Sequence, residues 1–191
     1  MAIRLEFVHL KKTQLNHQKI LIVGSGGAGK STLSRQLGEK WNLPVIHLDA
    51  MFWQPNWNPS PRPEFIERVK NELQKPAWII DGNYDSTMEL RAQYADLVIY
   101  LDFPKTLCLY RACKRAWTYR GTTRPDMGKD CPEKIDWEFV QWIWRYPTDV
   151  RPKMMTFLAN VQCDVVILRN PKEVEQWLHQ IPNVRKSESS I

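Results

Sequence analysis

The feature that most constrains this chain is one glycine-rich segment, Gly24-Ser25-Gly26-Gly27-Ala28-Gly29-Lys30-Ser31. It matches the phosphate-binding pattern G-x-x-x-x-G-K-S/T, with an apolar, strand-like run before it at residues 19–23 and a helical pattern after it at 30–40. Glycines let the backbone turn so that its N–H groups point at phosphate oxygens, and the positive end of the next helix faces the same phosphates. We therefore predict an ATP- or GTP-binding P-loop protein.

Each position of the loop has an expected role. Lys30 is expected to reach the β- and γ-phosphates, and Ser31 to offer its hydroxyl to Mg²⁺. Thr32 is a further candidate for a phosphate contact. The strand and helix on either side argue against a glycine-rich turn with a chance lysine. ATP and Mg²⁺ are the predicted cofactors, and the loop residues predicted to bind ATP are Gly24, Ser25, Gly26, Gly27, Ala28, Gly29, Lys30, Ser31 and Thr32.

The rest of the chain alternates between strand and helix patterns, which predicts an α/β fold with a mostly parallel sheet and right-handed crossovers. We expect an ordered, proline-rich loop at 50–63 and helices at 133–146 and 150–161 that are separated by Pro147. The other expected strands are 44–48, 77–80, 97–101 and 164–168, and the other expected helices are 62–75, 104–119 and 172–180.

These patterns suggest one P-loop domain at residues 19–181, with a lid near 118–132. Residues 1–18 are expected to form an N-terminal extension, either as an added edge strand or as a disordered leader. The polar tail at 182–191 is expected to be flexible. No run approaches the ~20 apolar residues of a membrane span and no secretory signal is evident, so we expect a cytoplasmic protein.

Charge and cysteine content narrow the partners further. The net charge is +6, and residues 105–124 hold six Lys or Arg residues and no Asp or Glu. Such a segment suits a polyanion, either nucleotide phosphates or nucleic acid, although a solvated basic helix face is the plainer alternative. The four cysteines form no metal-binding spacing, which favours reduced thiols and no zinc site.

Three aspartates follow predicted strands, where ligands of parallel sheets bind. Asp49 is expected to accept a proton from a substrate hydroxyl or to help hold Mg²⁺. Asp81 is expected to bind Mg²⁺ directly or through water, so the predicted metal-binding residues are Ser31, Asp81 and Asp49. Asp102 fits a helix cap.

Longer strings resemble a known family. Residues 46–53, 78–84, 101–104, 119–121, 123–127 and 131–133 together with the P-loop are similar to bacterial DNA topology modulation proteins related to FlaR, which sit among the adenylate kinase-like P-loop kinases. The resemblance spans roughly residues 19–178. It implies a five-stranded sheet in the order 2-3-1-4-5 and a short lid.

The resemblance also implies roles for several arginines. Arg111 and Arg115 lie four residues apart and match lid-helix arginines that clamp phosphates, while Arg120 and Arg124 lie in or near the lid. Arg169 falls in the loop that holds adenine in related kinases, although an ordinary strand-to-helix turn fits equally well. The predicted catalytic residues are therefore Lys30, Asp49, Arg111, Arg115 and Arg120, and Arg111 and Arg169 join the P-loop in binding ATP.

The acceptor side departs from the adenylate kinases. The third strand continues as Asp81-Gly82-Asn83-Tyr84, without the arginine that would bind an acceptor phosphate, and Arg91 is expected to substitute for it. Aromatic residues follow Asp49 and either line the acceptor pocket or pack in the core. The residues predicted to bind the acceptor are Asp49, Phe52, Trp53, Arg62, Asn83, Tyr84, Arg91 and Arg124.

The function expected from these features is a small-molecule or nucleotide kinase that uses ATP, as a monomer or homodimer. The alternative is an ATP-dependent regulatory protein or NTPase that acts on DNA topology. Nucleic acid is the less favoured partner, because no helix-turn-helix or other reading module is evident.

Overall fold

The computed structural model describes residues 17–124 and 126–182. The predicted N-terminal extension and polar tail lie outside these residues, apart from His17, Gln18 and Pro182. Among the described helices, none is both long enough and apolar enough to cross a membrane.

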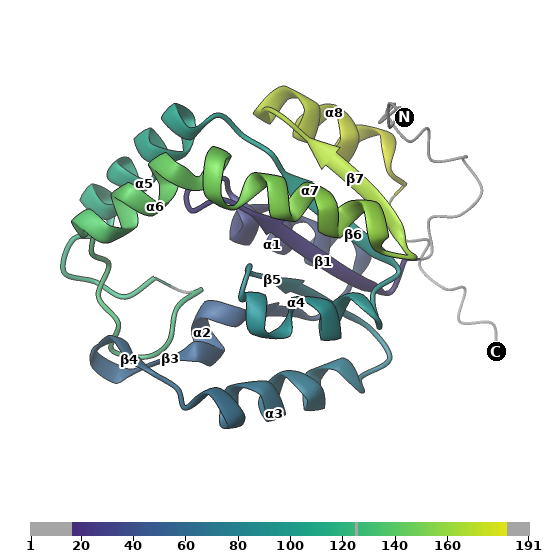
Figure 1. The fold of residues 1–191 in the computed structure, drawn as a ribbon, viewed down its shortest axis with the longest axis horizontal. Coiled ribbons are helices and arrows are strands. Elements are labelled where there is room, and N and C mark those ends of the chain that lie inside the picture. The colour runs from purple at the N-terminus through teal and green to yellow at the C-terminus, as the bar shows by residue number, and fades with distance from the viewer. Residues whose placement is uncertain (1–16, 125, 183–191) are drawn as a thin grey trace.

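A parallel sheet of five strands forms the centre of the molecule (Figure 1). Its strands are β1 (Lys19–Gly24), β2 (Val45–His47), β5 (Trp78–Asp81), β6 (Leu97–Leu101) and β7 (Asp164–Leu168). They lie in the order β2-β5-β1-β6-β7, so the predicted order 2-3-1-4-5 is confirmed. Ile20 of β1 pairs with Ile79 on one side and Leu97 on the other.

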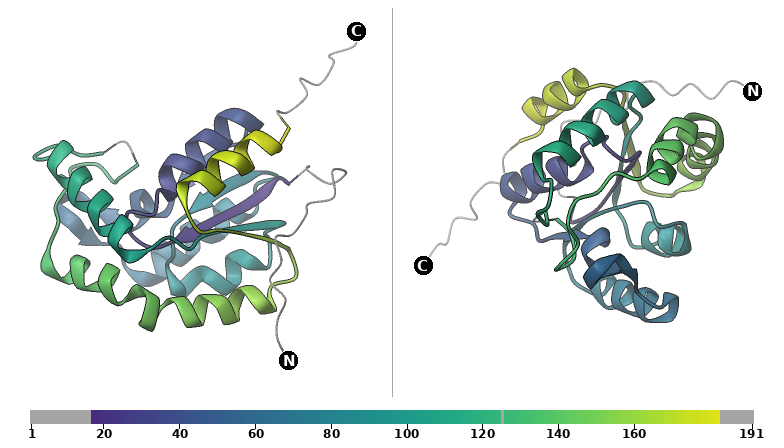
Figure 2. Two further views of the ribbon diagram at one scale, coloured as in Figure 1. Left: turned by 90° about the horizontal axis from the view of Figure 1, so that it is seen from above. Right: turned by 90° about the vertical axis from the view of Figure 1, so that its left-hand side faces the viewer.

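Helices cover both faces of this sheet (Figures 1 and 2). Ile20 and Ile22 point to the face covered by α1 (Lys30–Trp41), α5 (Lys105–Thr118) and α8 (Pro171–Gln180). Leu21 and Val23 point to the face covered by α3 (Arg62–Leu73), α4 (Asp85–Ala92), α6 (Trp137–Asp149) and α7 (Arg151–Asn160). With both faces buried, the strands read as continuous apolar runs.

The segment expected to be an irregular loop at 50–63 has more structure than predicted. It contains α2 (Leu48–Phe52), β3 (Trp53–Gln54), the 3-10 turn η1 (Pro55–Trp57) and β4 (Asn58–Pro59). β3 and β4 form a two-stranded antiparallel ladder that pairs Trp53 with Pro59. Pro59 fits because this ladder is short and isolated from the main sheet, where a missing N–H donor is tolerated.

The prediction that Pro147 separates two helices was wrong. α6 starts at Trp137 rather than at residue 133, and it continues through Pro147 to Asp149. The Asp136 side chain accepts a hydrogen bond from the N–H of Phe139 at 2.8 Å, which caps the start of the helix. Because Pro147 lies in the last turn of α6, its missing N–H removes one bond there, and the break falls at Val150.

Candidate active site

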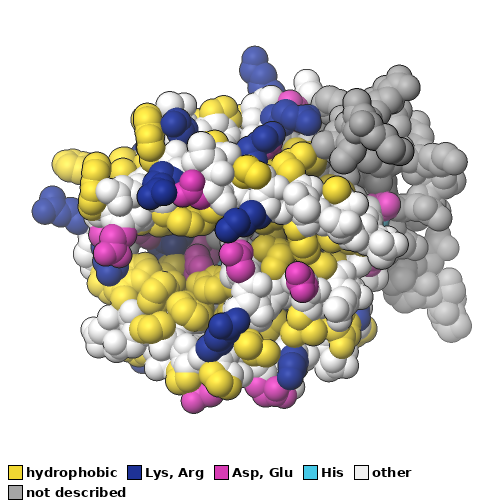
Figure 3. Space-filling model, viewed as in Figure 1, with side chains coloured by type: hydrophobic (Ala, Val, Ile, Leu, Met, Phe, Trp, Pro, Cys, Tyr) yellow, Lys and Arg dark blue, Asp and Glu magenta, His cyan; other side chains and the backbone are white. Residues whose placement is uncertain are grey.

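A cleft of about 1110 Å³ opens at the carboxyl ends of β1, β5 and β6. The P-loop lies at one end, and Asp49, Trp53, Trp57 and Tyr84 lie at the other. Figure 3 shows the hollow, bordered by hydrophobic side chains on the side of α2 and β3. Crevices at this edge of a parallel sheet are where such folds bind ligands.

The backbone of the P-loop takes a shape that requires glycine at several positions. Gly27 has φ +76°, and a Cβ there would overlap the carbonyl oxygen of Cys108 in α5. Gly24 has φ +150°, and a Cβ there would lie 2.7 Å from the carbonyl oxygen of Leu101. The loop is therefore pressed against its neighbours, and it leads into α1, whose N-terminal end faces the cleft.

Lys30 folds back over the loop. Its Nζ donates to the carbonyl oxygens of Gly24 at 3.0 Å and Ser25 at 3.1 Å. Removal from water lowers the pKa of Lys30, and the charges of Asp49 and Asp81 only partly offset this. A desolvated ammonium beside inward-facing amides suits an anion, so the donor set fits the phosphates of ATP.

The two lid-helix arginines both line the cleft. The Arg111 Nη1 lies 3.4 Å from the carbonyl oxygen of Ala28, and its guanidinium lies 5.5 Å from the centre of the Phe103 ring. Arg115 projects one turn further along α5 and donates from Nε to Glu133 Oε1 at 2.9 Å. Arg111 is thus placed at the P-loop and Arg115 at the lid.

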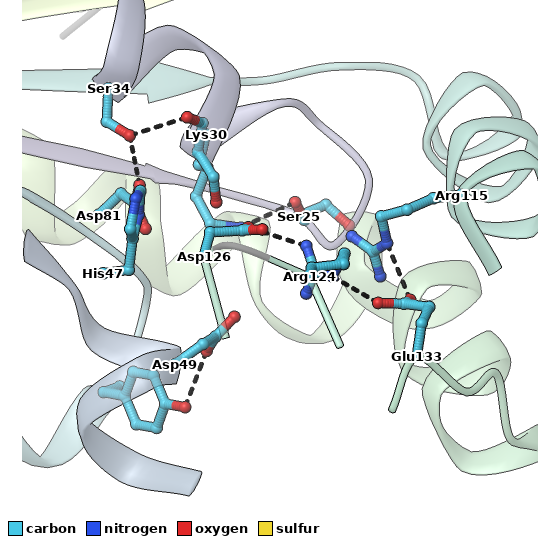
Figure 4. Close-up of polar contacts among 12 residues, drawn as sticks. Ser25, Lys30, Ser34, His47, Asp49, Asp81, Arg115, Arg124, Asp126 and Glu133 are labelled. Carbon is cyan, nitrogen blue, oxygen red and sulfur yellow. Dashed lines mark hydrogen bonds and ion pairs between the residues drawn. The ribbon is translucent and has the colours of Figure 1, made fainter. Parts of the chain in front are cut away.

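In the segment between α5 and α6 (residues 119–124 and 126–136), which includes the expected lid and is called the lid below, two acidic residues that we did not predict pair with arginines (Figure 4). Arg124 pairs with Asp126 at 2.8 Å and also with Glu133, which is almost fully buried. Burial alone would raise the pKa of Asp126, but the charge of Arg124 and a hydrogen bond with the Ser31 side chain hold it below its ordinary value. In the sequence, Asp126 and Glu133 are the first and third acids after the basic segment, with Asp130 between them, and nothing local distinguishes the two that pair with arginines.

Asp49 and Tyr84 form a pair at the acceptor end. β2 ends at His47, so Asp49 lies in the first turn of α2 rather than at a strand end as expected. The Tyr84 hydroxyl donates to Asp49 Oδ1 at 2.8 Å. Burial and the neighbouring Asp49 raise the pKa of Tyr84, so the phenol keeps its proton and holds the carboxylate in place.

Asp81 lies behind the P-loop and is 4% exposed. The register of β2 against β5 pairs it with His47, whose Nδ1 lies 2.7 Å from Asp81 Oδ2, and Ser34 Oγ donates to the same oxygen at 2.5 Å (Figure 4). Burial alone would lower the pKa of His47, but the hydrogen bond and charge of Asp81 outweigh it and raise the pKa. The predicted direct contact of Asp81 with Mg²⁺ does not fit this burial, whereas a contact through water stays a prediction.

Ser31 and Asp49 are the predicted metal-binding residues that line the cleft. Across residues 17–124 and 126–182, no group of three or more His, Cys, Asp or Glu side chains is arranged to hold a metal ion. Mg²⁺ keeps several waters and is bound by one or two protein oxygens together with substrate phosphates. A serine hydroxyl and a carboxylate therefore fit it.

The prediction that Arg91 contacts the acceptor was wrong. Its side chain is fully buried, and its guanidinium donates to the backbone oxygens of Gly82 at 3.0 Å, Asn83 and Tyr84 at 3.3 Å. Burial lowers the pKa of Arg91 to about 9, which still leaves it protonated at neutral pH. Arg91 shapes the loop after β5 instead of binding a ligand.

Asn83, a predicted acceptor residue, also has a structural contact. Its side-chain oxygen accepts a hydrogen bond from the Gly24 N–H at 3.1 Å, which ties the loop after β5 to the P-loop. Asn83 lines the cleft as well, so the structure places it between the two ends of the site.

Other predicted residues lie outside the cleft lining. Arg62 begins α3, Arg120 follows α5 and Arg169 precedes α8, and all three are exposed outside the lining. Pro171 and Val174 of α8 line the nucleotide end in place of Arg169. Whether these three side chains face the cleft depends on how the adjoining loops turn, and the sequence pattern did not specify that.

Among the aromatic residues, Phe52 and Trp53 have different positions. Phe52 packs between Trp53 and Tyr84, with 4.9 Å between ring centres in each case, and does not line the cleft. Trp53 and Trp57 do line it. So does Trp142, whose ring stacks on that of Phe139 with 6.1 Å between the ring centres.

Comparison with known proteins supports the fold. No protein-family model matches the chain, and no curated protein matches it. A solved structure described as "Shikimate kinase from Acinetobacter baumannii in complex with shikimate" is similar at 19% identity and a TM-score of 0.58, over 86% of this chain and 90% of that one. The chain has the fold of a P-loop kinase. The resemblance to DNA topology modulation proteins, which would place the chain in a narrower family than the fold does, stays a prediction.

Proposed function

We propose that this P-loop protein is an ATP-dependent kinase that transfers the γ-phosphoryl group to a hydroxyl of a small molecule. The observation that carries the proposal is the single cleft that joins Lys30 of the P-loop to the Asp49–Tyr84 pair, with Arg111 and Arg115 along it. The shared fold with a shikimate kinase supports it.

Each residue of the cleft has its own role in this proposal. The P-loop amides and Lys30 would bind the phosphates, and Ser31 would hold Mg²⁺, which would neutralise phosphate charge when bound. Asp49 accepts the proton of the attacking hydroxyl. Arg111 and Arg115 stabilise charge on the transferred group, and the lid excludes water.

ADP release tests the proposal. Purified protein with Mg²⁺ and ATP is given a panel of nucleosides, nucleoside monophosphates and small hydroxyl metabolites, with Lys30→Ala as the control. We expect acceptor-dependent ADP release that Lys30→Ala abolishes. Normal turnover in that variant would remove the P-loop from the mechanism.

A second variant tests the lid helix. In Arg115→Ala we expect kcat to fall by about 10²–10³, because a donor aimed at the transition state is lost, while the KM for ATP changes little. Steady-state kinetics with the best acceptor measures both constants. A change confined to the KM for ATP would assign Arg115 to ground-state binding of ATP.

A regulatory protein that contacts DNA is the second candidate, and one surface favours it. The outer faces of α5 and α6 expose Tyr110, Trp117, Trp137 and Trp144, and Lys105 lies 3.7 Å from the centre of the Trp144 ring. Exposed aromatic and basic side chains suit a single nucleic acid strand. Salt-dependent DNA binding that ATP does not compete away would favour this candidate, and slow ADP release without any acceptor would indicate a simple NTPase.

A further inference from the structure

The acceptor end of the cleft is walled by aromatic rings. Trp53, Trp57 and Tyr84 line it, with 5.4 Å between the ring centres of the two tryptophans. Phe52 packs edge-on against Trp53, and the buried Phe65 lies 5.0 Å from Tyr84. Rings supported from behind in this way form a fixed surface. Such a surface suits a flat ligand.

Trp57 is held at this wall in an unusual backbone conformation. Asn56 and Trp57 have φ values of 62° and 61°. For a bulky residue such a conformation is an outlier that costs on the order of 1–3 kcal/mol, and it persists only where the surroundings impose it. The lid imposes it here, because Asn56 N donates to Asp130 O and Trp57 Nε1 donates to Pro132 O, each at 2.9 Å. Strain kept at the wall of a cleft points to a role in binding.

The aromatic wall holds one positive charge, and that charge has an acidic partner. The two arginines expected to bind an anionic acceptor are elsewhere, since Arg91 is buried on backbone carbonyls and Arg62 is exposed outside the cleft lining. Lys134 lies 5.1 Å from the centre of the Trp57 ring and 3.8 Å from Asp136. No unpaired cation of the described residues therefore belongs to this wall.

The remaining cations that line the cleft are ion-paired, bonded to carbonyl oxygens of the P-loop, or carried by α1. Arg115 and Arg124 form ion pairs with Glu133 and Asp126. Arg35 is the one lining cation in the described part of the chain without a recorded hydrogen bond or ion pair, and it projects from α1 one turn after Ser31. Among the lining cations of the described residues, an anionic group on the acceptor would therefore have Arg35 as its one partner that is not already bonded.

The charge that the acceptor does meet is negative. Asp49 is part of the lining, beside Tyr84. A carboxylate or phosphate held close to it would be repelled, and more strongly in the cleft than in bulk water. A neutral hydroxyl can instead donate a hydrogen bond to Asp49.

We infer that the acceptor is an uncharged hydroxyl compound with a planar ring, which stacks on Trp57 and meets Trp53 at an angle of about 65°, while its hydroxyl lies at Asp49. The inference rests on the proposed kinase function. The hydroxyl oxygen forms a bond to the γ-phosphorus, the bond from that phosphorus to the β–γ bridging oxygen breaks, ADP leaves and Asp49 takes the proton. Nucleoside monophosphates and acidic ring compounds are poor acceptors on this view.

Matched pairs of acceptors test the inference. We would compare nucleosides with their 5′-monophosphates, and methyl 4-(hydroxymethyl)benzoate with 4-(hydroxymethyl)benzoate, by ADP release with Mg²⁺ and ATP after subtraction of the Lys30→Ala background. The neutral member should give at least a tenfold higher kcat/KM. A preference for the anionic members would overturn the inference and leave the kinase proposal standing. If no member stimulates release while another hydroxyl compound of the broader panel does, the inference fails and the kinase proposal stands; if no compound of the broader panel does, the kinase proposal fails.

Two variants test which residues of the cleft recognise the acceptor. Trp57→Leu should raise the acceptor KM about tenfold or more, because stacking on an aromatic side chain contributes about 1–3 kcal/mol. The KM for ATP should stay within twofold, and Trp57→Phe should restore most of the loss. Arg35→Ala is the control and should leave the acceptor KM unchanged. A large rise in Arg35→Ala with none in Trp57→Leu would assign recognition to an anionic group and overturn the inference.

Discussion

Arg91 carries its charge into the interior, where the guanidinium satisfies the carbonyl oxygens of the loop after β5 and also donates to Thr87 Oγ1 at 3.1 Å. Arg62 looks like an equivalent acceptor residue in the sequence but lies exposed at the start of α3. The difference arises only from tertiary packing, so the two arginines make a matched pair for experiment.

Arg91→Met should lower the free energy of unfolding by about 2–3 kcal/mol, because buried carbonyl oxygens lose their donors. Arg62→Met should change it by no more than about 0.5 kcal/mol, as expected of an exposed site. Urea denaturation measures both. Equal stability of the two variants would contradict the structural role of Arg91.

His47 should make stability depend on pH. Its pKa is raised in the folded state, so its contribution is fully present below the unfolded value of about 6.5 and is lost as the pH rises through the folded pKa. We would measure denaturation of the native protein and of His47→Gln between pH 5 and 8. The native protein should have the higher free energy of unfolding at low pH, and this difference should fall as the pH rises. His179→Gln, at the exposed end of α8, is the control and should follow the native curve.

Among the elements, the lid depends most on a single side chain. Glu133 is buried between Arg115 of α5 and Arg124 of the lid itself. Glu133→Gln should loosen the lid, because one charged partner of two arginines is lost from a buried site. Limited proteolysis should cut residues 119–136 several-fold faster in this variant.

Asp130→Asn provides the comparison, because it also converts a lid acid to an amide but at an exposed position with φ 55°, which asparagine tolerates. We expect its cleavage rate to match the native protein. Equal cleavage of the Glu133→Gln and Asp130→Asn variants would show that the buried ion pairs do not hold the lid.

The elements also show how far the sequence could be interpreted. Apolar runs and the P-loop motif are local signals, and they predicted the strands, while the sheet order came from the family resemblance. The β3–β4 ladder was missed because it forms against the lid, through bonds such as Cys131 Sγ to Gln54 O at 3.2 Å. The lid acids were missed for the same reason, since Asp126 and Glu133 become partners of Arg124 only after the chain folds back.

The candidate site shows the same contrast between local sequence signals and tertiary packing. Lys30 and Ser31 were predictable because the motif fixes their spacing. Phe52 and Trp53 are neighbours in sequence, yet only Trp53 lines the cleft, because the backbone changes from α2 to β3 between them. Whether a residue of such a segment packs against other side chains or lines the cleft depends on the fold.

At the scale of the whole molecule, the cleft lies between the two helical layers, so a bound nucleotide should stabilise the fold. ATP with Mg²⁺ at about 100 times its Kd should raise the free energy of unfolding by about 2.7 kcal/mol. Thermal denaturation with and without nucleotide measures the shift in Tm. Lys30→Ala should lose most of it, and a full shift in that variant would place the nucleotide elsewhere.

The contact between the lid and the aromatic wall has a consequence for the reaction cycle. Asp130 O and Pro132 O accept hydrogen bonds from Asn56 N and Trp57 Nε1, so the lid is attached to the ring that we propose recognises the acceptor. We expect these bonds to break when the product leaves. Opening of the lid should then limit turnover, and the first round of product should form faster than the later ones.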